Sequence, residues 1–368
     1  WMRALGSGVV LRRGLRAVRA SYPELDGGLA AEAERKGGTP SAIHGVITPR
    51  PELFDPRRSE SIVVSASRLE ALGRCPLRYL HASVLRVYPP DDPELDPDVW
   101  LDPRQRGSLL HSVFDRTLRD SVDSGVRVDD AAFERLALER LAEGIAQLRH
   151  EVPIPGEGTL QRESAALRED VRSFVRMVRE DGAKWVRLEL RFGLEGDEPV
   201  TLDLPGGTLR LRGAIDRVDE DLAGLHVIDY KTGTAYGFER GVFDGGRRLQ
   251  HAIYAHVAEA RLQNDVVDGQ YHFPTRRGQN QSFSYDRLQL APVGALLEIL
   301  LDGVAAGHFV PTNEADDCTF CDFAAVCRAH RTEWGKTVSP LAAWSDEHTN
   351  LGIQPAFAQL KRARTFEE

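Results

Sequence analysis

Several features that define common protein classes are missing from this 368-residue chain, or nearly so. Cysteine occurs four times, and lysine occurs only at Lys36, Lys184, Lys231, Lys336 and Lys361, so arginine carries most of the positive charge. No apolar run approaches the length of a membrane-spanning helix, and we therefore expect no membrane segment. The phosphate-binding motif G-x-x-x-x-G-K-[ST] is also absent, which argues against an ATP-driven motor within these residues.

The composition is that of a globular protein with an acidic surface. Hydrophobic residues make up 42% of the chain, and the formal net charge is −9. This balance argues against a protein that is basic all over, but an arginine-lined channel for nucleic acid is compatible with an acidic exterior. The first residue is Trp1 rather than Met, so we expect the chain to be a piece of a longer protein, with a start at Met2 as the alternative.

The four cysteines have an informative arrangement. Cys75 stands alone near the start, whereas Cys318, Cys321 and Cys327 follow a C-x2-C-x5-C spacing near the end. Thiolates at such a spacing hold a metal ion or an iron–sulfur cluster, and a ligand from far upstream completes the site. Structural zinc, two disulfides and four unconnected thiols remain open as alternatives, although disulfides require an oxidising compartment. A shared site would link the two ends of the segment between Cys75 and Cys318.

Hydrophobic periodicity divides the chain into three parts. Residues 1–60 are expected to be an N-terminal extension or linker at the end of a preceding region, residues 61–332 a folded domain, and residues 333–368 a C-terminal tail. Within the domain, helical periods come first, strands with period-2 alternation follow, and helices return after them. The first helix is expected to be capped by Ser65 or Ser67, with Glu70 three residues after Ser67 as in a capping box. The expected strands cover residues 186–192, 199–204, 208–216, 225–231 and 267–273.

The strongest chemical signal comes from three residues on two neighbouring strands. Asp229 and Lys231 are two positions apart on a strand, so both side chains point to the same face. Asp216 is expected at the end of the preceding strand, where it can converge on the same place. Two carboxylates form a site for Mg²⁺ or Mn²⁺, which activates water for attack on a phosphoryl group. The alternative is a polar hairpin with surface ion pairs, but the apolar Val227-Ile228 pair predicts a buried strand.

These residues resemble the PD-(D/E)xK nuclease pattern, and three further motifs narrow the resemblance. They are the segment 65–76, which ends in Cys75-Pro76, the spacing Gly107-x-x-x-His111, and Gln250-x-x-x-Tyr254. With the cysteines, they make residues 60–330 similar to RecB-like nucleases that carry an iron–sulfur staple. The resemblance is greatest to the C-terminal nuclease domain of AddB-type helicase–nuclease subunits.

The resemblance implies a fold and a set of roles. The fold is α/β, with a restriction-endonuclease-like core in which a mixed sheet is flanked by helices and closed by a four-cysteine 4Fe-4S cluster. Lys231 would be the catalytic lysine, with Glu189 a further acidic residue of the site. The metal ligands would be His111, Asp216, Asp229 and the backbone carbonyl of Tyr230, whereas Gln250 and Tyr254 would position DNA.

The resemblance also implies a function. We expect a Mg²⁺- or Mn²⁺-dependent deoxyribonuclease that cuts single-stranded DNA, more as an exonuclease than as an endonuclease. It would work beside a helicase partner or motor region in double-strand-break repair and recombination, in a prokaryotic cytoplasm and away from membranes. Alternatives are a free-standing or CRISPR-associated four-cysteine exonuclease, a nuclease-dead DNA-binding scaffold, and a zinc-stapled protein that binds another protein chain.

Overall fold

The computed structural model describes residues 14, 16, 19, 22–35, 38–88, 96–182, 185–327, 331–333 and 336–367. Its centre is a seven-stranded sheet in the order β1-β4-β5-β6-β7, with β2 and β3 also paired to β4. These strands are β1 (Val63–Ser65), β2 (Trp185–Phe192), β3 (Val200–Leu204), β4 (Gly207–Glu220), β5 (Leu225–Tyr230), β6 (Val266–Phe273) and β7 (Gln281–Asp286). The β1–β4 and β5–β6 pairs are parallel and the others antiparallel, so the sheet is mixed, as predicted.

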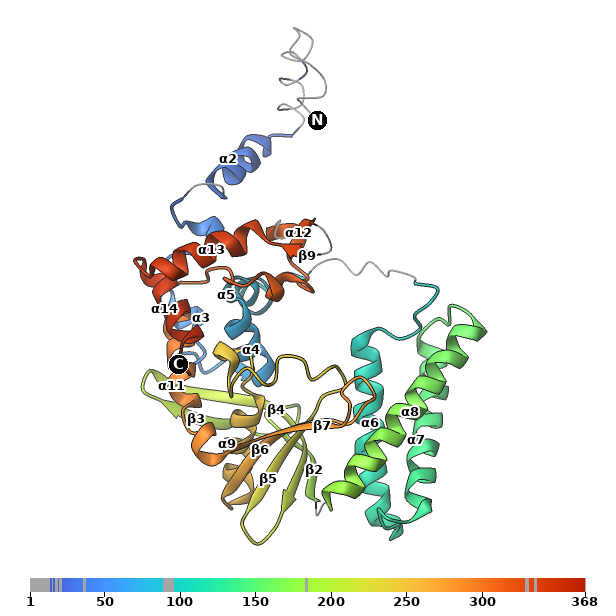
Figure 1. The fold of residues 1–368 in the computed structure, drawn as a ribbon. Coiled ribbons are helices and arrows are strands. Elements are labelled where there is room, and N and C mark those ends of the chain that lie inside the picture. The colour runs from blue at the N-terminus through green and yellow to red at the C-terminus, as the bar shows by residue number, and fades with distance from the viewer. Residues whose placement is uncertain are drawn as a thin grey trace.

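Helices lie on both faces of this sheet (Figure 1). The described helices are α2 (Leu25–Arg35), η1 (Ala42–His44), α3 (Pro51–Phe54), α4 (Ala66–Arg74), α5 (Pro76–Tyr79), η2 (Leu80–Val84), α6 (Pro103–Ser124), α7 (Ala131–Glu151), α8 (Glu157–Asp181), η3 (Asp244–Gly246), α9 (Gln250–Leu262), α10 (Arg287–Leu290), α11 (Val293–Ala305), η4 (Ala315–Cys318), α12 (Ala324–Cys327), α13 (Pro340–Leu351) and α14 (Pro355–Arg364). A short hairpin, β8 (Arg331–Glu333) and β9 (Lys336–Val338), precedes α13. The predicted α/β fold is confirmed.

Helices α6, α7 and α8 cover one face of the sheet (Figure 1). Phe114 of α6 stacks on Phe174 of α8 with ring centroids 4.1 Å apart, and Tyr230 of β5 meets both rings edge-on. The three rings are buried in one apolar cluster with Ile228. Burial of several aromatic rings stabilises a domain by kilocalories per mole, so this cluster holds α6 firmly over the end of β5.

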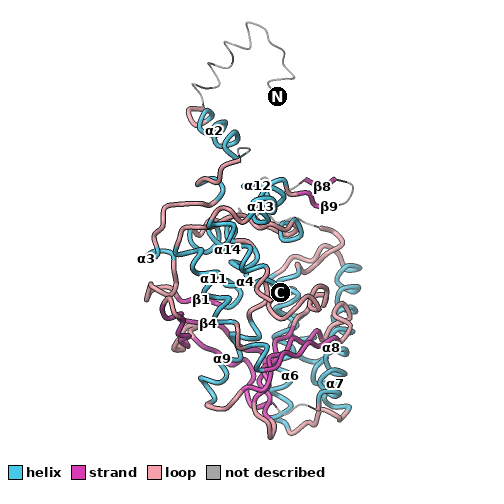
Figure 2. The backbone as a smooth tube through the Cα atoms, turned by 60° about the vertical axis from the view of Figure 1, so that its left-hand side comes forward, coloured by secondary structure: helices cyan, strands magenta, loops and turns pink. Residues whose placement is uncertain are grey.

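Helices α4, α9 and α11 lie on the other side of the strands (Figure 2). Their buried residues form a second apolar cluster with the sheet, which includes Leu69, Ile253 and Leu297. The stretch Arg287–Ala305, which contains α10 and α11, is long and apolar enough to cross a membrane by length and composition alone. The sequence led us to expect no such stretch. Its leucines Leu297 and Leu301 are fully buried in this cluster, as in the core helix of a globular fold.

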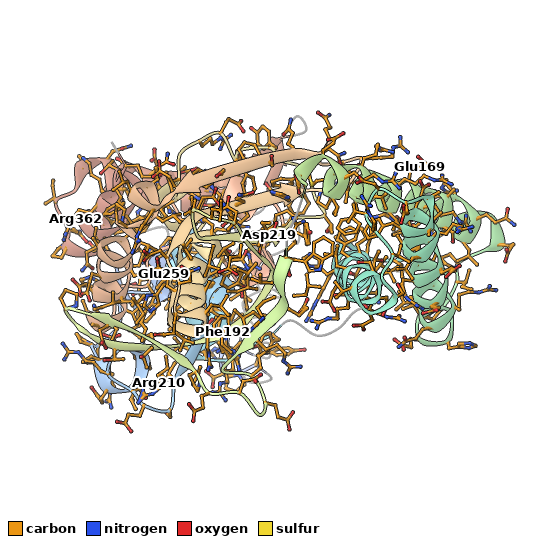
Figure 3. The ribbon with its side chains drawn as sticks, turned by 90° about the horizontal axis from the view of Figure 1, so that it is seen from below. Glu169, Phe192, Arg210, Asp219, Glu259 and Arg362 are labelled. Carbon is orange, nitrogen blue, oxygen red and sulfur yellow. The ribbon has the colours of Figure 1, made fainter. Side chains whose placement is uncertain are left out.

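The C-terminal helices pack against the rest of the fold. Phe357 of α14 is fully buried, and the carboxylate of Glu367 accepts hydrogen bonds from the backbone N–H groups of Phe243 and Asp244, at 2.6 and 3.0 Å. Seen from below, Arg362 of α14 and Glu169 of α8 lie at opposite ends of the molecule, with the sheet between them (Figure 3). Residues 340–367 therefore contribute to the folded body, and the division of the chain at 60 and 332 stays a prediction.

Candidate active site

The site lies where strands β4 and β5 separate. Their last paired residues are Arg217 and Ile228, and β5 then continues beside β6 alone. The backbone N–H of Tyr230 donates instead to the side chain of Asp216, at 2.7 Å from Oδ2. Sequence reasoning expected the strand to end at Asp216, but β4 continues to Glu220. The carboxylate of Asp216 therefore takes the place of a backbone acceptor and is held at the opening between the strands.

His111 reaches this opening from α6. Its Nδ1 lies 3.2 Å from Asp216 Oδ1. Gly107 lies one helical turn before His111 and packs against Thr232, the residue after Lys231. A Cβ added at Gly107 would lie 3.3 Å from Thr232 Oγ1. The Gly107-x-x-x-His111 spacing thus has a steric reason, because the glycine lets α6 approach the strand end. Burial lowers the pKa of His111, but the carboxylate of Asp216 outweighs that effect and the net pKa is raised.

Asp229 and Lys231 form a close buried pair. Asp229 is 5% exposed, and its Oδ2 lies 2.5 Å from Lys231 Nζ. Burial raises the pKa of Asp229 to about 6 despite the opposing charge of Lys231. Burial also lowers the pKa of Lys231, but the carboxylates of Asp229 and Glu70 outweigh it, so the net pKa is raised. The lysine is therefore held in its charged form next to a carboxylate.

Helix α9 supports the lysine from the other side. Gln250 Oε1 accepts a short hydrogen bond from Lys231 Nζ, and Gln250 Nε2 donates to the Tyr254 hydroxyl at 3.4 Å. Tyr254 is 7% exposed and meets the ring of Phe192 edge-on at 6.1 Å. The structure therefore brings Gln250 to Lys231 and Tyr254 behind it, and the predicted role of both residues in positioning DNA stays a prediction.

Glu189 stands beside Asp216 on the neighbouring strand. It lies between Leu188 and Leu190 of β2, which pair with Arg217 and Ile215 of β4, and its φ of 48° is unusual for a residue with a side chain. Burial raises its pKa, and the carboxylate of Asp216 raises it further. A second carboxylate near Asp216 is consistent with the predicted acidic residue, whose role stays a prediction.

Sequence reasoning missed Glu70. It offered Ser65 or Ser67 as the cap of this helix and paired Glu70 with Ser67 in a capping box, whereas the N-cap of α4 is Ser65, whose hydroxyl accepts from Arg68 N at 3.3 Å. The capping-box interpretation was wrong. Glu70 instead contacts the start of α9, which is remote in sequence, and its charge acts on Lys231. No local pattern marks such a contact.

The residues fit a divalent cation by the chemistry of their donors. Carboxylate oxygens of two aspartates and one imidazole surround the strand opening, and Asp229 Oδ2 is buried with no hydrogen bond of regular geometry. A buried carboxylate oxygen needs a cation to compensate for its charge, and here the ammonium of Lys231, 2.5 Å away, supplies it. Across the described residues, however, no group of three His, Cys, Asp or Glu side chains is already gathered closely enough to hold a metal ion. Asp229 forms an ion pair with Lys231 instead.

All four cysteines line one pocket. Cys75 follows α4 directly, and the other three come from the η4–α12 segment. None forms a disulfide. Burial raises the pKa of the Cys75 thiol to about 11 and that of Cys327 to about 12, with further increases from the neighbouring thiols. Four thiols that line one pocket are the right donor set for iron–sulfur or zinc, but among the described residues no three of them lie close enough together to hold a metal ion.

Comparison with known proteins agrees with the family that the sequence resembles. Residues 63–328 match the family model described as the PD-(D/E)XK nuclease superfamily. Relatives named as subunits of an ATP-dependent helicase/deoxyribonuclease come from Symbiobacterium thermophilum (30% identity over 215 residues), Lacticaseibacillus casei (31% over 210) and Desulforudis audaxviator (31% over 199). These alignments cover 53%, 52% and 50% of this chain, but only 17%, 17% and 16% of the relatives. Because the family match includes the strand opening, His111 and all four cysteines, the chain belongs to the PD-(D/E)XK nuclease superfamily.

Proposed function

We propose that this chain is a Mg²⁺- or Mn²⁺-dependent deoxyribonuclease that hydrolyses phosphodiester bonds. The observation that carries the proposal is the convergence of His111, Asp216, Asp229 and Lys231 where β4 and β5 separate. A charged lysine beside two carboxylates suits the hydrolysis of a phosphodiester, in which negative charge increases on the phosphoryl oxygens. The family and the names of the relatives support a nuclease role.

The residues have distinct parts in this reaction. His111, Asp216, Asp229 and the carbonyl of Tyr230 would hold the cation, which when bound polarises the phosphoryl oxygen and activates a water molecule. Lys231 Nζ, released from Asp229, would stabilise the charge on the phosphate. The attacking water gives up a proton as its oxygen bonds to phosphorus, the bond from phosphorus to the leaving sugar oxygen breaks, and that oxygen takes up a proton.

Exposed arginines near the site support a nucleic-acid substrate. Arg276 and Arg277 lie on the loop between β6 and β7, and within the described part of the chain neither side chain has an ion-pair partner. Thr275 of this loop donates to the carbonyl of Thr232 at 3.3 Å, so the loop adjoins the residue after Lys231. Unpaired guanidinium groups at this place suit the phosphates of a bound strand.

A 4Fe-4S cluster on Cys75, Cys318, Cys321 and Cys327 is the second part of the proposal, with zinc as the alternative occupant. Hydrolysis transfers no electrons, so the group would act as a structural link between the two ends of the domain. Closing a loop of this length stabilises a fold by about 5 kcal/mol in the chain-entropy approximation developed for disulfides. The shared pocket of the four thiols supports this role.

The wider setting is inferred from the relatives. Their printed names combine a helicase with a deoxyribonuclease, and the chain spans about one sixth of their length. We infer that the domain cuts single-stranded DNA that a helicase partner or motor region delivers, as an exonuclease in bacterial double-strand-break repair, in the cytoplasm. A free-standing or CRISPR-associated exonuclease, and a scaffold without cleavage, are the other outcomes of the test.

The test is cleavage of end-labelled single- and double-stranded DNA by anaerobically purified protein, with and without Mg²⁺. Asp229→Ala should abolish cleavage, whereas Asp203→Ala, on the exposed edge of β3, should leave it unchanged. The label shows the direction of cutting. Wild-type protein that is folded, binds DNA and fails to cut under all these conditions would identify a scaffold and refute the nuclease proposal.

A further inference from the structure

We propose that Glu70 is a positioning residue, which fixes the first turn of α9 and thereby holds Gln250 against the amine of Lys231. The inference rests on the proposed nuclease function, because it concerns the same site. Glu70 belongs to α4, the helix that ends at Cys75, whereas Gln250 begins α9. A single carboxylate would thus connect the four-cysteine pocket with the catalytic lysine.

The contacts of Glu70 are those of an N-cap supplied by another helix. Its Oε1 accepts hydrogen bonds from the backbone N–H groups of Leu249 and Gln250, at 2.8 and 3.0 Å. The first N–H groups of a helix have no partner within the helix, and Leu249 offers no side-chain cap of its own. A carboxylate at this end of a helix is also favoured by the helix dipole.

Gln250 connects the first turn of α9 to the lysine. Its backbone N–H is held by Glu70, while its side-chain Oε1 accepts from Lys231 Nζ. Its Nε2 donates to Tyr254, one turn further along α9, so the amide cannot rotate without losing one of these bonds. Rotation or translation of the first turn of α9 would therefore move the group that orients Lys231.

Helix α4 is itself held at both ends. Ser65 caps its start, and Arg364 of α14 donates to the carbonyl of Gly73 at 2.6 Å. Near its end, Gly73 packs against Gly246, just before α9, so closely that an added Cβ would lie 1.9 Å from Gly246 O. Since Cys75 follows directly, a change at the cysteine pocket can reach Lys231 through this one rigid helix.

Three variants test the proposal in the cleavage assay. Glu70→Ala removes the cap, and Glu70→Gln keeps a side-chain oxygen that can accept both N–H groups. Asp286→Ala is the matched control, because Asp286 caps α10 by accepting from Gln289 N at 3.0 Å on the exposed side of the fold. We expect Glu70→Ala to lower kcat by about tenfold or more with little change in KM, because small misplacements of catalytic groups have large effects on rate. Glu70→Gln should restore most of kcat, and Asp286→Ala should behave as wild type.

A double variant and hydrogen exchange separate this role from general stability. If Glu70 acts through Gln250, Glu70→Ala combined with Gln250→Ala should lose no more kcat than Gln250→Ala alone. In the same proteins, exchange protection of the Leu249 and Gln250 amides should disappear in Glu70→Ala and persist in Glu70→Gln, and this readout needs no cleavage. Absence of cleavage by wild-type protein would count against the nuclease function alone. Wild-type kcat in Glu70→Ala, additive losses in the double variant, or unchanged amide protection would each overturn the positioning role.

Discussion

The contact between Gly73 and Gly246 leads to a sharp prediction. Gly73 lies near the end of α4, and a Cβ added there would meet Gly246 O at 1.9 Å and Gly246 C at 2.4 Å. Both atoms belong to the backbone, so no side chain can rotate away. To reach van der Waals contact, α4 and the η3 segment must separate by about 1.5 Å. Gly73→Ala therefore forces apart the two segments that set the position of α9.

Two opposing effects determine the magnitude. Alanine is favoured over glycine inside a helix by about 1 kcal/mol. Overpacking against backbone costs about 1–3 kcal/mol, and the substitution would also strain the hydrogen bond from Arg364 to the Gly73 carbonyl, which is 2.6 Å long. We expect a net loss of about 1–2 kcal/mol in the free energy of unfolding. A displacement of this size near Gln250 should also lower kcat by about tenfold to a hundredfold.

Urea unfolding and the cleavage assay measure the two effects. Gly303→Ala is the control, because Gly303 is also a buried helical glycine, yet its added Cβ would lie 3.5 Å from Gln359 Oε1 and 3.6 Å from His308 O. This control should gain up to about 1 kcal/mol and keep its activity. If Gly73→Ala were as stable and as active as Gly303→Ala, the close packing of α4 on η3 would not control the site.

Three further predictions concern other parts of the fold. Burial lowers the pKa of His251 from 6.5 to about 3, so the contribution of this neutral histidine to stability is complete above pH 6.5 and is lost as the pH falls. Between about pH 7 and pH 5 we expect the free energy of unfolding, measured with urea, to fall by about 2 kcal/mol. His251→Gln should not show this fall. Arg364→Met leaves the carbonyls of Gly73, Arg74 and Gly245 without their donor, and should lower the free energy of unfolding by about 2–3 kcal/mol; a loss well below 1 kcal/mol would contradict this. Cys75→Ser should remove the iron and acid-labile sulfide of anaerobically purified protein and lower its stability by about 5 kcal/mol, whereas full retention of iron would exclude Cys75 as a ligand.

The family and the fold class could be predicted from the sequence, because their evidence is local. Strand periods, the two-residue spacing of Asp229 and Lys231, and the cysteine spacing depend only on neighbouring residues. Covalent geometry places residues i and i+2 of a strand on the same face whatever the rest of the chain does. The confirmed family and mixed sheet show how far such local rules extend.

The connections between distant segments were decided by tertiary packing alone. Glu70 reaches Leu249 across 179 residues, and its local sequence gave a different, incorrect interpretation as a capping-box residue. Asp216 was expected at a strand end, yet it lies within β4, because the backbone on either side of it pairs with β2 and the residues after it pair with β5. A local pattern specifies which groups a segment offers, whereas the partner of each group depends on which segments the apolar clusters bring into contact.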